Sequence, residues 1–185
     1  MNGSEPAARE PSAEDSSTRS RILVATAEVL ARSGHTKLSL SEVALQAGVS
    51  RPTLYRWFAD KQALLDGFGI YEREMFDDGI SHATSGLRGN EKLDAALRFI
   101  VQYQQSYSGV RLVDIEPEVV IAQLANVIPV MRARLLKLLS GANAPVKAAT
   151  AIRVAVSHYI VRSDDADQFL AQLRHAVGIK ASEPN

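Results

Sequence analysis

The stretch LSLSEVALQAGVSRPTLYRWFADK, residues 38–61, constrains the fold of this chain more than any other. It predicts a short helix that begins after Ser39, because serine is a good N-cap and a glutamate three residues later completes the capping-box pattern. Gly48 follows the apolar residues of that helix, where a positive φ ends a helix at little cost. Ser50 caps a second short helix, and Pro52 suits its first turn. Helix, tight turn and helix form a helix-turn-helix, whose second helix enters the major groove of DNA.

The second predicted helix has an inward and an outward side. Leu54 and Phe58 are four residues apart and can both face the core, which leaves hydroxyl, phenol and guanidinium groups outside. Such groups suit phosphate oxygens and base edges. Lys61, at the start of the next helix, suits a phosphate because a helix N-terminus attracts anions. The predicted DNA-binding residues are Arg21, Ser39, Ser50, Arg51, Pro52, Thr53, Tyr55, Arg56, Trp57 and Lys61.

The run from Ile22 to Leu65 resembles the DNA-binding domain of the TetR family of bacterial repressors. The resemblance rests on Gly34 at the end of the first helix and on the segments EVALQAGVS, TLYRWF and DKQALL, and it covers about a quarter of the sequence. One position departs from the family pattern. Many relatives carry a histidine that can reach a phosphate where this protein has Trp57, whose indole keeps one N–H donor on a larger ring. Trp57 is therefore expected either to contact phosphate or to pack against the next helix.

The charge of the protein is unevenly distributed. The formal net charge is zero, which taken alone argues against a DNA-binding protein. Residues 19–61, however, hold seven bases and three acids, so the positive charge is concentrated on the predicted helix-turn-helix. Residues 1–17 hold four acids and one arginine and have little to bury, which predicts a disordered tail. We therefore predict a DNA-binding domain over residues 18–61.

The sequence argues against several other classes of protein. There is no cysteine, and the four histidines (His35, His82, His158 and His175) share no metal-binding or catalytic spacing. A glycine-rich phosphate loop and a nucleophile elbow are also missing from the sequence. We expect no catalytic residue, no cofactor and no metal. The composition further predicts a cytoplasmic protein with neither a secretion signal nor a membrane span.

Residues 62–185 read as helices throughout, which predicts an all-α fold with an N-terminal three-helix helix-turn-helix domain and a C-terminal helical domain. Gly67 and Gly69 weaken the first of these helices, and they suggest either a lever between two domains or close packing of helix on helix. Pro129 is expected to end or kink a helix that starts near Pro117. The other predicted helices are 91–107 after an Asn90 cap, 131–139, 146–162, and a last one capped by Asp164.

The resemblance to the TetR family implies that the C-terminal domain binds a small effector and forms a homodimer through its last two helices. A dimer also suits DNA, because two reading heads related by a twofold axis contact half-sites roughly 34 Å apart. The predicted pocket residues are Phe68, Tyr71, Phe99, Tyr103, Tyr107, Leu124 and Met131. The predicted interface residues are Ala149, Ile152, Val156, Tyr159, Phe169, Leu173 and Val177. For each pocket residue, packing in the core of the protomer is the favoured explanation, because an aromatic at helical spacing usually packs. For the interface residues, core packing and dimer contact are both expected, on different faces of the helices.

Two functions remain open at this point. The first is a TetR-like, sequence-specific regulator of double-stranded DNA, namely a repressor that an unknown small apolar effector releases from a palindromic operator. The second is a DNA-binding architectural or partner-controlled regulator that has no small-molecule effector.

Overall fold

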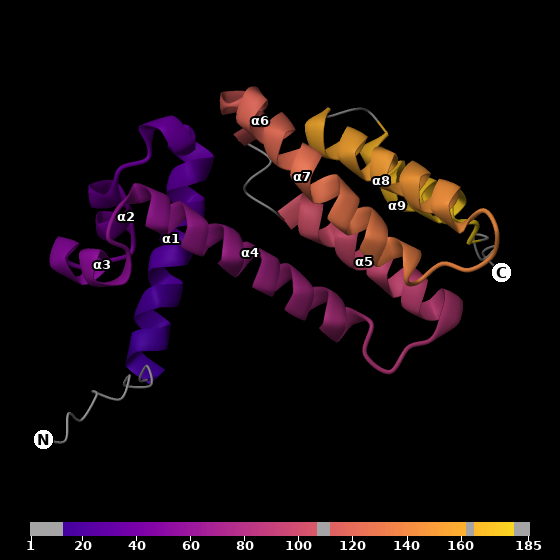
Figure 1. Cartoon of the computed structure of the whole chain (residues 1–185), viewed down its shortest axis with the longest axis horizontal. Coiled ribbons are helices and arrows are strands. Elements are labelled where there is room, and N and C mark those ends of the chain that lie inside the picture. The colour runs from indigo at the N-terminus through magenta and orange to yellow at the C-terminus, as the bar shows by residue number, and fades with distance from the viewer. Residues whose placement is uncertain (1–12, 107–111, 162–164, 180–185) are drawn as a thin grey trace, which may run out of the picture. The chain divides into compact units, whose positions relative to one another are not determined.

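The computed structural model describes residues 13–106, 112–161 and 165–179, and all regular structure in these ranges is helical (Figure 1). This confirms the all-α class. The protein divides into two units, Met1–Tyr71 and Glu72–Asn185. The division falls inside α4 (Lys61–Ala83), later than the boundary after residue 61 that the sequence suggested.

The N-terminal unit consists of α1 (Ala13–Lys37), α2 (Leu40–Gln46), α3 (Arg51–Trp57) and the first part of α4. Helix α1 begins earlier than predicted, so residues 13–17 are helical and not part of a disordered tail, whereas residues 1–12 lie outside the described residues. Gly34 has φ 73° and kinks α1 near its C-terminal end. The core of this unit is formed by fully buried side chains from all four helices: Ile22, Leu23, Val29, Val43, Leu54 and Leu64.

The C-terminal unit consists of the rest of α4, α5 (Gly89–Ser106), α6 (Leu112–Ile115), α7 (Pro117–Leu136), α8 (Ala144–Ile160), a 3-10 turn (Ala166–Gln168) and α9 (Phe169–Val177). Helix α8 packs against both α7 and α9, and α9 packs against α5. Asn90 lies inside the first turn of α5 and does not cap it, because this helix already begins at Gly89. Asp164, the predicted cap of the last helix, lies outside the described residues.

Pro129 does not interrupt α7, contrary to the prediction of two separate helices around it. The helix runs unbroken from Pro117 to Leu136 with the proline in its interior. A proline there removes the hydrogen bond to the carbonyl of Ala125, four residues earlier. Both residues are exposed, so water can satisfy that carbonyl, and the helix tolerates the missing donor.

A partly buried ion pair ties α5 to α9. The guanidinium of Arg174 donates to both carboxylate oxygens of Asp94 at 2.6 and 2.9 Å, and Arg98 donates to the same carboxylate at 2.8 Å. The hydrogen bond from Arg174, and then that from Arg98, lower the pKa of Asp94 to about 2 despite its partial burial. The carboxylate is therefore charged at every physiological pH.

Candidate nucleic-acid interface

Serine caps position the two short helices as the sequence predicts. The Ser39 hydroxyl accepts from the backbone N–H of Glu42 at 3.2 Å, and the Ser50 hydroxyl accepts from that of Thr53 at 3.2 Å. Each cap satisfies one of the four N–H groups that a helix N-terminus leaves unpaired. The Glu42 carboxylate lies 3.6 Å from the guanidinium of Arg32, on the facing helix α1.

The turn between the helices needs a glycine. Gly48 has φ 63°, a left-handed conformation that residues with a Cβ rarely adopt. The following N–H, that of Val49, donates to the carbonyl of Ala44 at 3.0 Å, which closes the end of α2. Val49 itself is partly buried against the core. Together these contacts fix the direction in which α3 leaves the turn.

Arg21 supports the same turn from α1. Its Nη2 donates to the carbonyls of Ala47 and Gly48, at 2.8 and 3.1 Å. These are the orphan carbonyls at the end of α2, so the guanidinium caps the C-terminus of the first helix of the motif. The sequence singled Arg21 out as a DNA contact but gave no sign of this role, because the two segments are far apart in the sequence.

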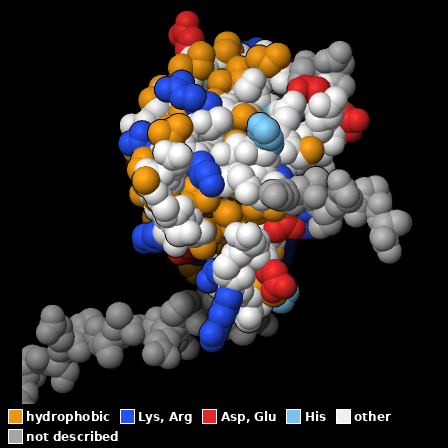
Figure 2. All heavy atoms as spheres, turned by 90° about the vertical axis from the view of Figure 1, so that its right-hand side faces the viewer, with side chains coloured by type: hydrophobic (Ala, Val, Ile, Leu, Met, Phe, Trp, Pro, Cys, Tyr) orange, Lys and Arg blue, Asp and Glu red, His pale blue; other side chains and the backbone are white. Residues whose placement is uncertain are grey.

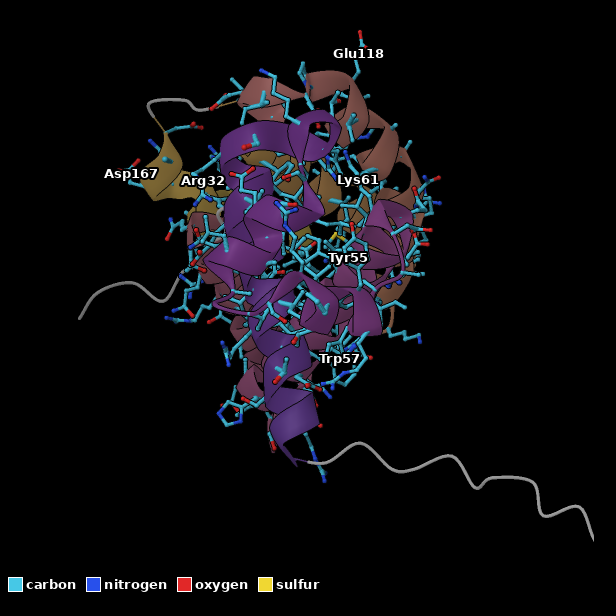
Figure 3. The ribbon with its side chains drawn as sticks, turned by 90° about the vertical axis from the view of Figure 1, so that its left-hand side faces the viewer. Arg32, Tyr55, Trp57, Lys61, Glu118 and Asp167 are labelled. Carbon is cyan, nitrogen blue, oxygen red and sulfur yellow. The ribbon has the colours of Figure 1, made fainter. Side chains whose placement is uncertain are left out.

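Helix α3 divides into a buried and an exposed side. Leu54 is 0% and Phe58 is 4% exposed, which confirms that both face the core. The outer side presents exposed Arg51, Pro52, Tyr55 and Arg56, with Thr53 half-buried. Figure 3 labels Tyr55 on this helix. The Thr53 hydroxyl lies 2.8 Å from that of Ser50, so these two hydroxyls are already paired with each other.

Trp57 packs against the core of the N-terminal unit, and the Arg56 guanidinium carbon lies 5.9 Å from its ring centroid. The indole N–H is buried and has no hydrogen-bond partner among the described residues. A buried unpaired donor is costly and uncommon. The Trp57 ring therefore packs against the core, as one of the two predicted alternatives holds, while its indole N–H has no acceptor among the described residues.

Lys61 and Asp60 define the start of α4. The Asp60 carboxylate accepts from the backbone N–H of Ala63 at 2.8 Å and so caps the helix. The Lys61 ammonium donates to the carbonyl of Thr36 at 3.0 Å, which ties α4 to the end of α1. An ammonium has three N–H groups, so this contact leaves two for another acceptor. The phosphate contact of Lys61 remains a prediction.

Helix α3 carries two arginines, Arg51 and Arg56, and no acidic residue. Away from that helix, the Gln46 side-chain amide donates a hydrogen bond to the Glu28 carboxylate and accepts one from the Arg32 guanidinium at 3.3 Å. These groups pair with one another on the surface of α1 and α2. The arginines of α3 have no acidic neighbour within their own helix, so the reading helix presents the cationic side chains.

The predicted pocket residues do not come together in one place. Phe68 and Tyr71 pack in the N-terminal unit, and Tyr107 lies outside the described residues. In the C-terminal unit, Phe99 and Tyr103 form an aromatic cluster with Phe76, whose ring centroid lies 5.3 and 5.1 Å from theirs. The remaining two, Leu124 and Met131, lie half-buried on α7. Sequence periodicity missed Phe76 as a cluster member, since it could not relate α4 to α5.

Two polar side chains lie where α5 faces α8. Gln104, next to Tyr103, donates to the carbonyl of Ala155 at 3.2 Å, while its side-chain oxygen is buried without a partner among the described residues. One turn further along α8, burial and then the nearby carboxylate of Glu72 raise the pKa of Tyr159.

Six of the seven predicted interface residues fall into two groups, and the seventh, Tyr159, is half-buried on α8. Phe169, Leu173 and Val177 are at most 3% exposed and belong to the core of their own protomer, which is the alternative that the sequence left open for them. Ala149, Ile152 and Val156 instead line a groove of about 360 Å³ between α7 and α8. The other lining residues of this groove are Ile128, Arg132, Arg153 and Ser157.

No group of three or more His, Asp or Glu side chains is arranged to hold a metal ion within the described residues.

The class of protein that the fold defines is an all-helical DNA-binding protein, with a helix-turn-helix reading head followed by a separate helical unit.

Comparisons with known proteins found a family model that matches the reading head and solved structures that share the fold. Residues 22–67 match the model of the bacterial regulatory proteins, tetR family. No curated protein matches the sequence. Among solved structures, a TetR-family transcriptional regulator from Streptomyces coelicolor is similar with a TM-score of 0.66 and 16% identity, over 88% of this protein and 95% of that one. A TetR-like regulator from Rhodococcus is similar with a TM-score of 0.62 and 18% identity, over 93% and 100%.

A third similar structure is that of the transcriptional regulator FadR from Bacillus subtilis in complex with stearoyl-CoA, with a TM-score of 0.60 and 15% identity over 88% and 99% of the two proteins. Identities this low establish a shared fold only. The family model matches the reading head, residues 22–67, and the solved structures show that the rest of the protein shares the fold of TetR-family regulators.

Proposed function

We propose that this protein is a homodimeric repressor that binds a palindromic operator and is released from it by a small apolar effector. The observation that carries the DNA-binding part is the geometry of α3. Its serine cap, the glycine turn and the clamp from Arg21 hold Arg51, Tyr55 and Arg56 together on one exposed side. Two such helices related by a twofold axis would read half-sites roughly 34 Å apart.

Different side chains of this surface have different roles in the proposal. Arg51, Thr53 and Arg56 influence the choice of base, because guanidinium and hydroxyl groups can pair with base edges in the major groove. Tyr55 and Lys61 hold phosphates and so set the orientation of the protein on the duplex. The unpaired indole N–H of Trp57 would gain an acceptor if its ring shifted toward a phosphate.

The effector is proposed to bind beside the aromatic cluster of Phe76, Phe99 and Tyr103. Small-molecule sites in proteins are mostly apolar with a few placed polar groups, and the three packed rings supply such an apolar surface. The FadR structure, which holds stearoyl-CoA, supports the idea that this fold accommodates a small molecule. An effector can release the operator only through its different affinity for two states of the protein.

Selection of genomic fragments by the purified protein would test the proposal. The selected operator would then be titrated with the wild-type protein, with Arg51→Ala and with Arg73→Ala. Arg73 is an exposed arginine of the C-terminal unit, so its removal changes the charge equally but leaves the reading head intact. We expect Arg51→Ala to lower the affinity for the operator by about tenfold and to relax the base preference at one base pair. Arg73→Ala should leave the affinity unchanged.

If the purified protein selected no palindromic site, the proposal that it is a dimeric repressor would be contradicted. Tight operator binding that no small molecule alters, tested with extracts of the cell as the effector source, would favour the regulator without an effector.

A further inference from the structure

Packing alone does not explain why the last residue of α3 is a tryptophan. The Trp57 ring packs against the core of the N-terminal unit, but its indole N–H is buried without a partner among the described residues. A buried donor that makes no hydrogen bond costs free energy. A phenylalanine would offer an apolar ring to the same core without leaving a donor unpaired. An indole at this position therefore calls for a role besides packing.

The guanidinium of Arg56 lies over the Trp57 ring. Its carbon is 5.9 Å from the ring centroid, within the distance of about 6 Å at which an aromatic face attracts a cation. Tryptophan is the strongest of the aromatic residues in this interaction. Consecutive residues of a helix do not face each other, so the contact forms only because both side chains lean together at the end of α3. The exposed guanidinium of Arg56 is thus held against a ring of its own helix.

The backbone that carries the Trp57 ring is anchored on both sides. Leu54, one turn earlier, is fully buried, and Phe58, the next residue, is 4% exposed. The backbone N–H of Phe58 donates to the carbonyl of Leu54 at 2.9 Å, which closes the last turn of α3. A Cβ at Gly67 would lie 2.6 Å from the Phe58 ring, so α4 packs tightly against that ring. The core therefore fixes the position of the ring on which Arg56 lies.

Exposed cationic side chains are common on this protein, so charge alone does not single out Arg56. Figure 2 shows lysine and arginine side chains scattered over a face of the C-terminal unit, among hydrophobic ones. Arg51, the other arginine of α3, has no ring contact among the described residues. A long side chain that rotates freely loses conformational entropy when it binds, whereas one that is already held in place loses less. Arg56 is therefore the better placed of the two to read a base.

We infer that Trp57 is a positioning residue for base recognition, whose indole face holds the Arg56 guanidinium in place to contact a guanine. Guanine fits this role because its O6 and N7 atoms accept two N–H groups of one guanidinium in the major groove. Trp57 then influences the sequence preference without touching DNA. This inference rests on the proposed function and names how its reading helix selects a base. The competing role, an indole N–H that donates to a phosphate, requires the buried N–H to become exposed.

The first test needs no DNA, because Trp57 is the only tryptophan of the sequence and its fluorescence reports on this ring alone. Acrylamide quenching of the tryptophan emission would be measured for the wild-type protein, Arg56→Ala and Arg51→Ala. Arg56→Ala should raise the quenching constant, because the ring loses the side chain that covers one face. Arg51→Ala, which removes the same charge from the same helix, should leave it unchanged. Equal quenching constants for the two variants would overturn the inference, because the ring would then have no specific contact with Arg56.

The second test measures the base preference. The operator recovered by the genomic-fragment selection would be compared, by fluorescence anisotropy, with duplexes in which each base pair is changed singly. Trp57→Leu should lower the discrimination at one G·C pair by about threefold, the size expected of a cation–π contact at an exposed site. Trp57→Phe, which keeps an aromatic face but no N–H, should retain most of it. In an Arg56→Ala background, Trp57→Leu should cause no further loss at that pair, because the two residues act through one contact.

A phosphate contact by the indole N–H gives a different pattern. Trp57→Phe and Trp57→Leu would then lower the affinity for the operator and for an unrelated duplex alike, and this result would refute the positioning role. Thermal melting by circular dichroism would confirm that each variant is folded. Trp57→Phe keeps an aromatic ring against the core, and Arg56 is exposed, so both tests stay decisive if Trp57→Leu proves unstable.

Failure of this inference is distinct from failure of the proposed function. If the protein selects a palindromic operator but Trp57→Leu leaves every base preference intact, the positioning role is wrong and the proposed function stands. If the protein selects no operator, both are removed, since Arg56 then reads no base.

Discussion

The surroundings of Gly67 show which of two explanations accounts for a glycine inside α4: a flexible lever between domains, or close packing of helix on helix. In the structure, a Cβ at Gly67 would lie 2.6 Å from Cε1 of Phe58 and 3.5 Å from Cδ1 and Cζ. The Phe58 ring is only 4% exposed, and the Arg19 guanidinium carbon lies 6.0 Å from its centroid, so the ring has little room to move. The glycine is therefore needed for α4 to pack against the end of α3.

Gly67→Ala tests this account through the sign of its effect on stability. Alanine in a helix interior is favoured over glycine by about 1 kcal/mol. Overpacking of a buried ring costs roughly 1–3 kcal/mol, which is the larger effect. We expect a net loss of about 1 kcal/mol, or a melting temperature lower by roughly 2–4 °C. Urea and thermal unfolding, followed by circular dichroism, would measure it.

The matched control places Gly67→Ala in a Phe58→Leu background. A leucine there removes the ring edge that the new methyl would meet, so the same substitution should become neutral or stabilising. The coupling between the two sites is the quantity that the double-mutant cycle isolates. If Gly67→Ala stabilises the wild-type protein by about 1 kcal/mol, the contact with Phe58 does not require a glycine, and the result favours the flexible lever.

Three further predictions concern contacts seen in the structure. Arg21→Ala should lower stability by about 1 kcal/mol and weaken operator binding, because two hydrogen bonds to the turn are lost, and Arg21→Lys should restore part of each in melting and DNA titration. Lys61→Ala should weaken all DNA sequences similarly and lower the salt slope by about one unit, whereas an unchanged slope with lower stability would limit Lys61 to its contact with Thr36. Asp94, whose pKa is lowered from 3.8 to about 2, should contribute roughly 1–2 kcal/mol above pH ~4. That contribution should be lost as the pH falls through about 2. Asp94→Asn should remove this acid-dependent part of the urea unfolding free energy.

The reading head could be predicted from the sequence because its signals are local. The caps Ser39 and Ser50, the glycine turn at Gly48 and the spacing of Leu54 and Phe58 each act within a few residues. The structure confirms the N-cap hydrogen bonds and the burial of both apolar side chains. Short-range patterns of this kind decide backbone conformation before tertiary packing is considered.

Contacts between distant segments were not predictable in the same way. The role of Arg21 at the turn depends on how α1 lies against α2, which periodicity does not reveal. Phe76 belongs to the aromatic cluster because its ring, on α4, meets two rings of α5. Helical spacing identified apolar stripes correctly but could not say which stripe faces its own core.

Helix α7 shows a second limit of local rules. A proline inside a helix lacks the backbone N–H for one hydrogen bond, and its ring clashes with the carbonyl four residues earlier, so prolines are rare there. Pro129 nevertheless lies within a continuous helix. Exposure of the surrounding residues reduces that cost, and exposure is a tertiary property.

The salt dependence of operator binding, compared with that of an unrelated duplex of equal length, tests the central claim most directly. Fluorescence anisotropy at several salt concentrations would measure both. The account predicts a palindromic operator bound as a dimer, much more tightly than the unrelated duplex, with a steep slope of about 0.9 per phosphate contacted. Equal, weak affinity for the two duplexes at every salt concentration would contradict it, because α3 would then read no sequence.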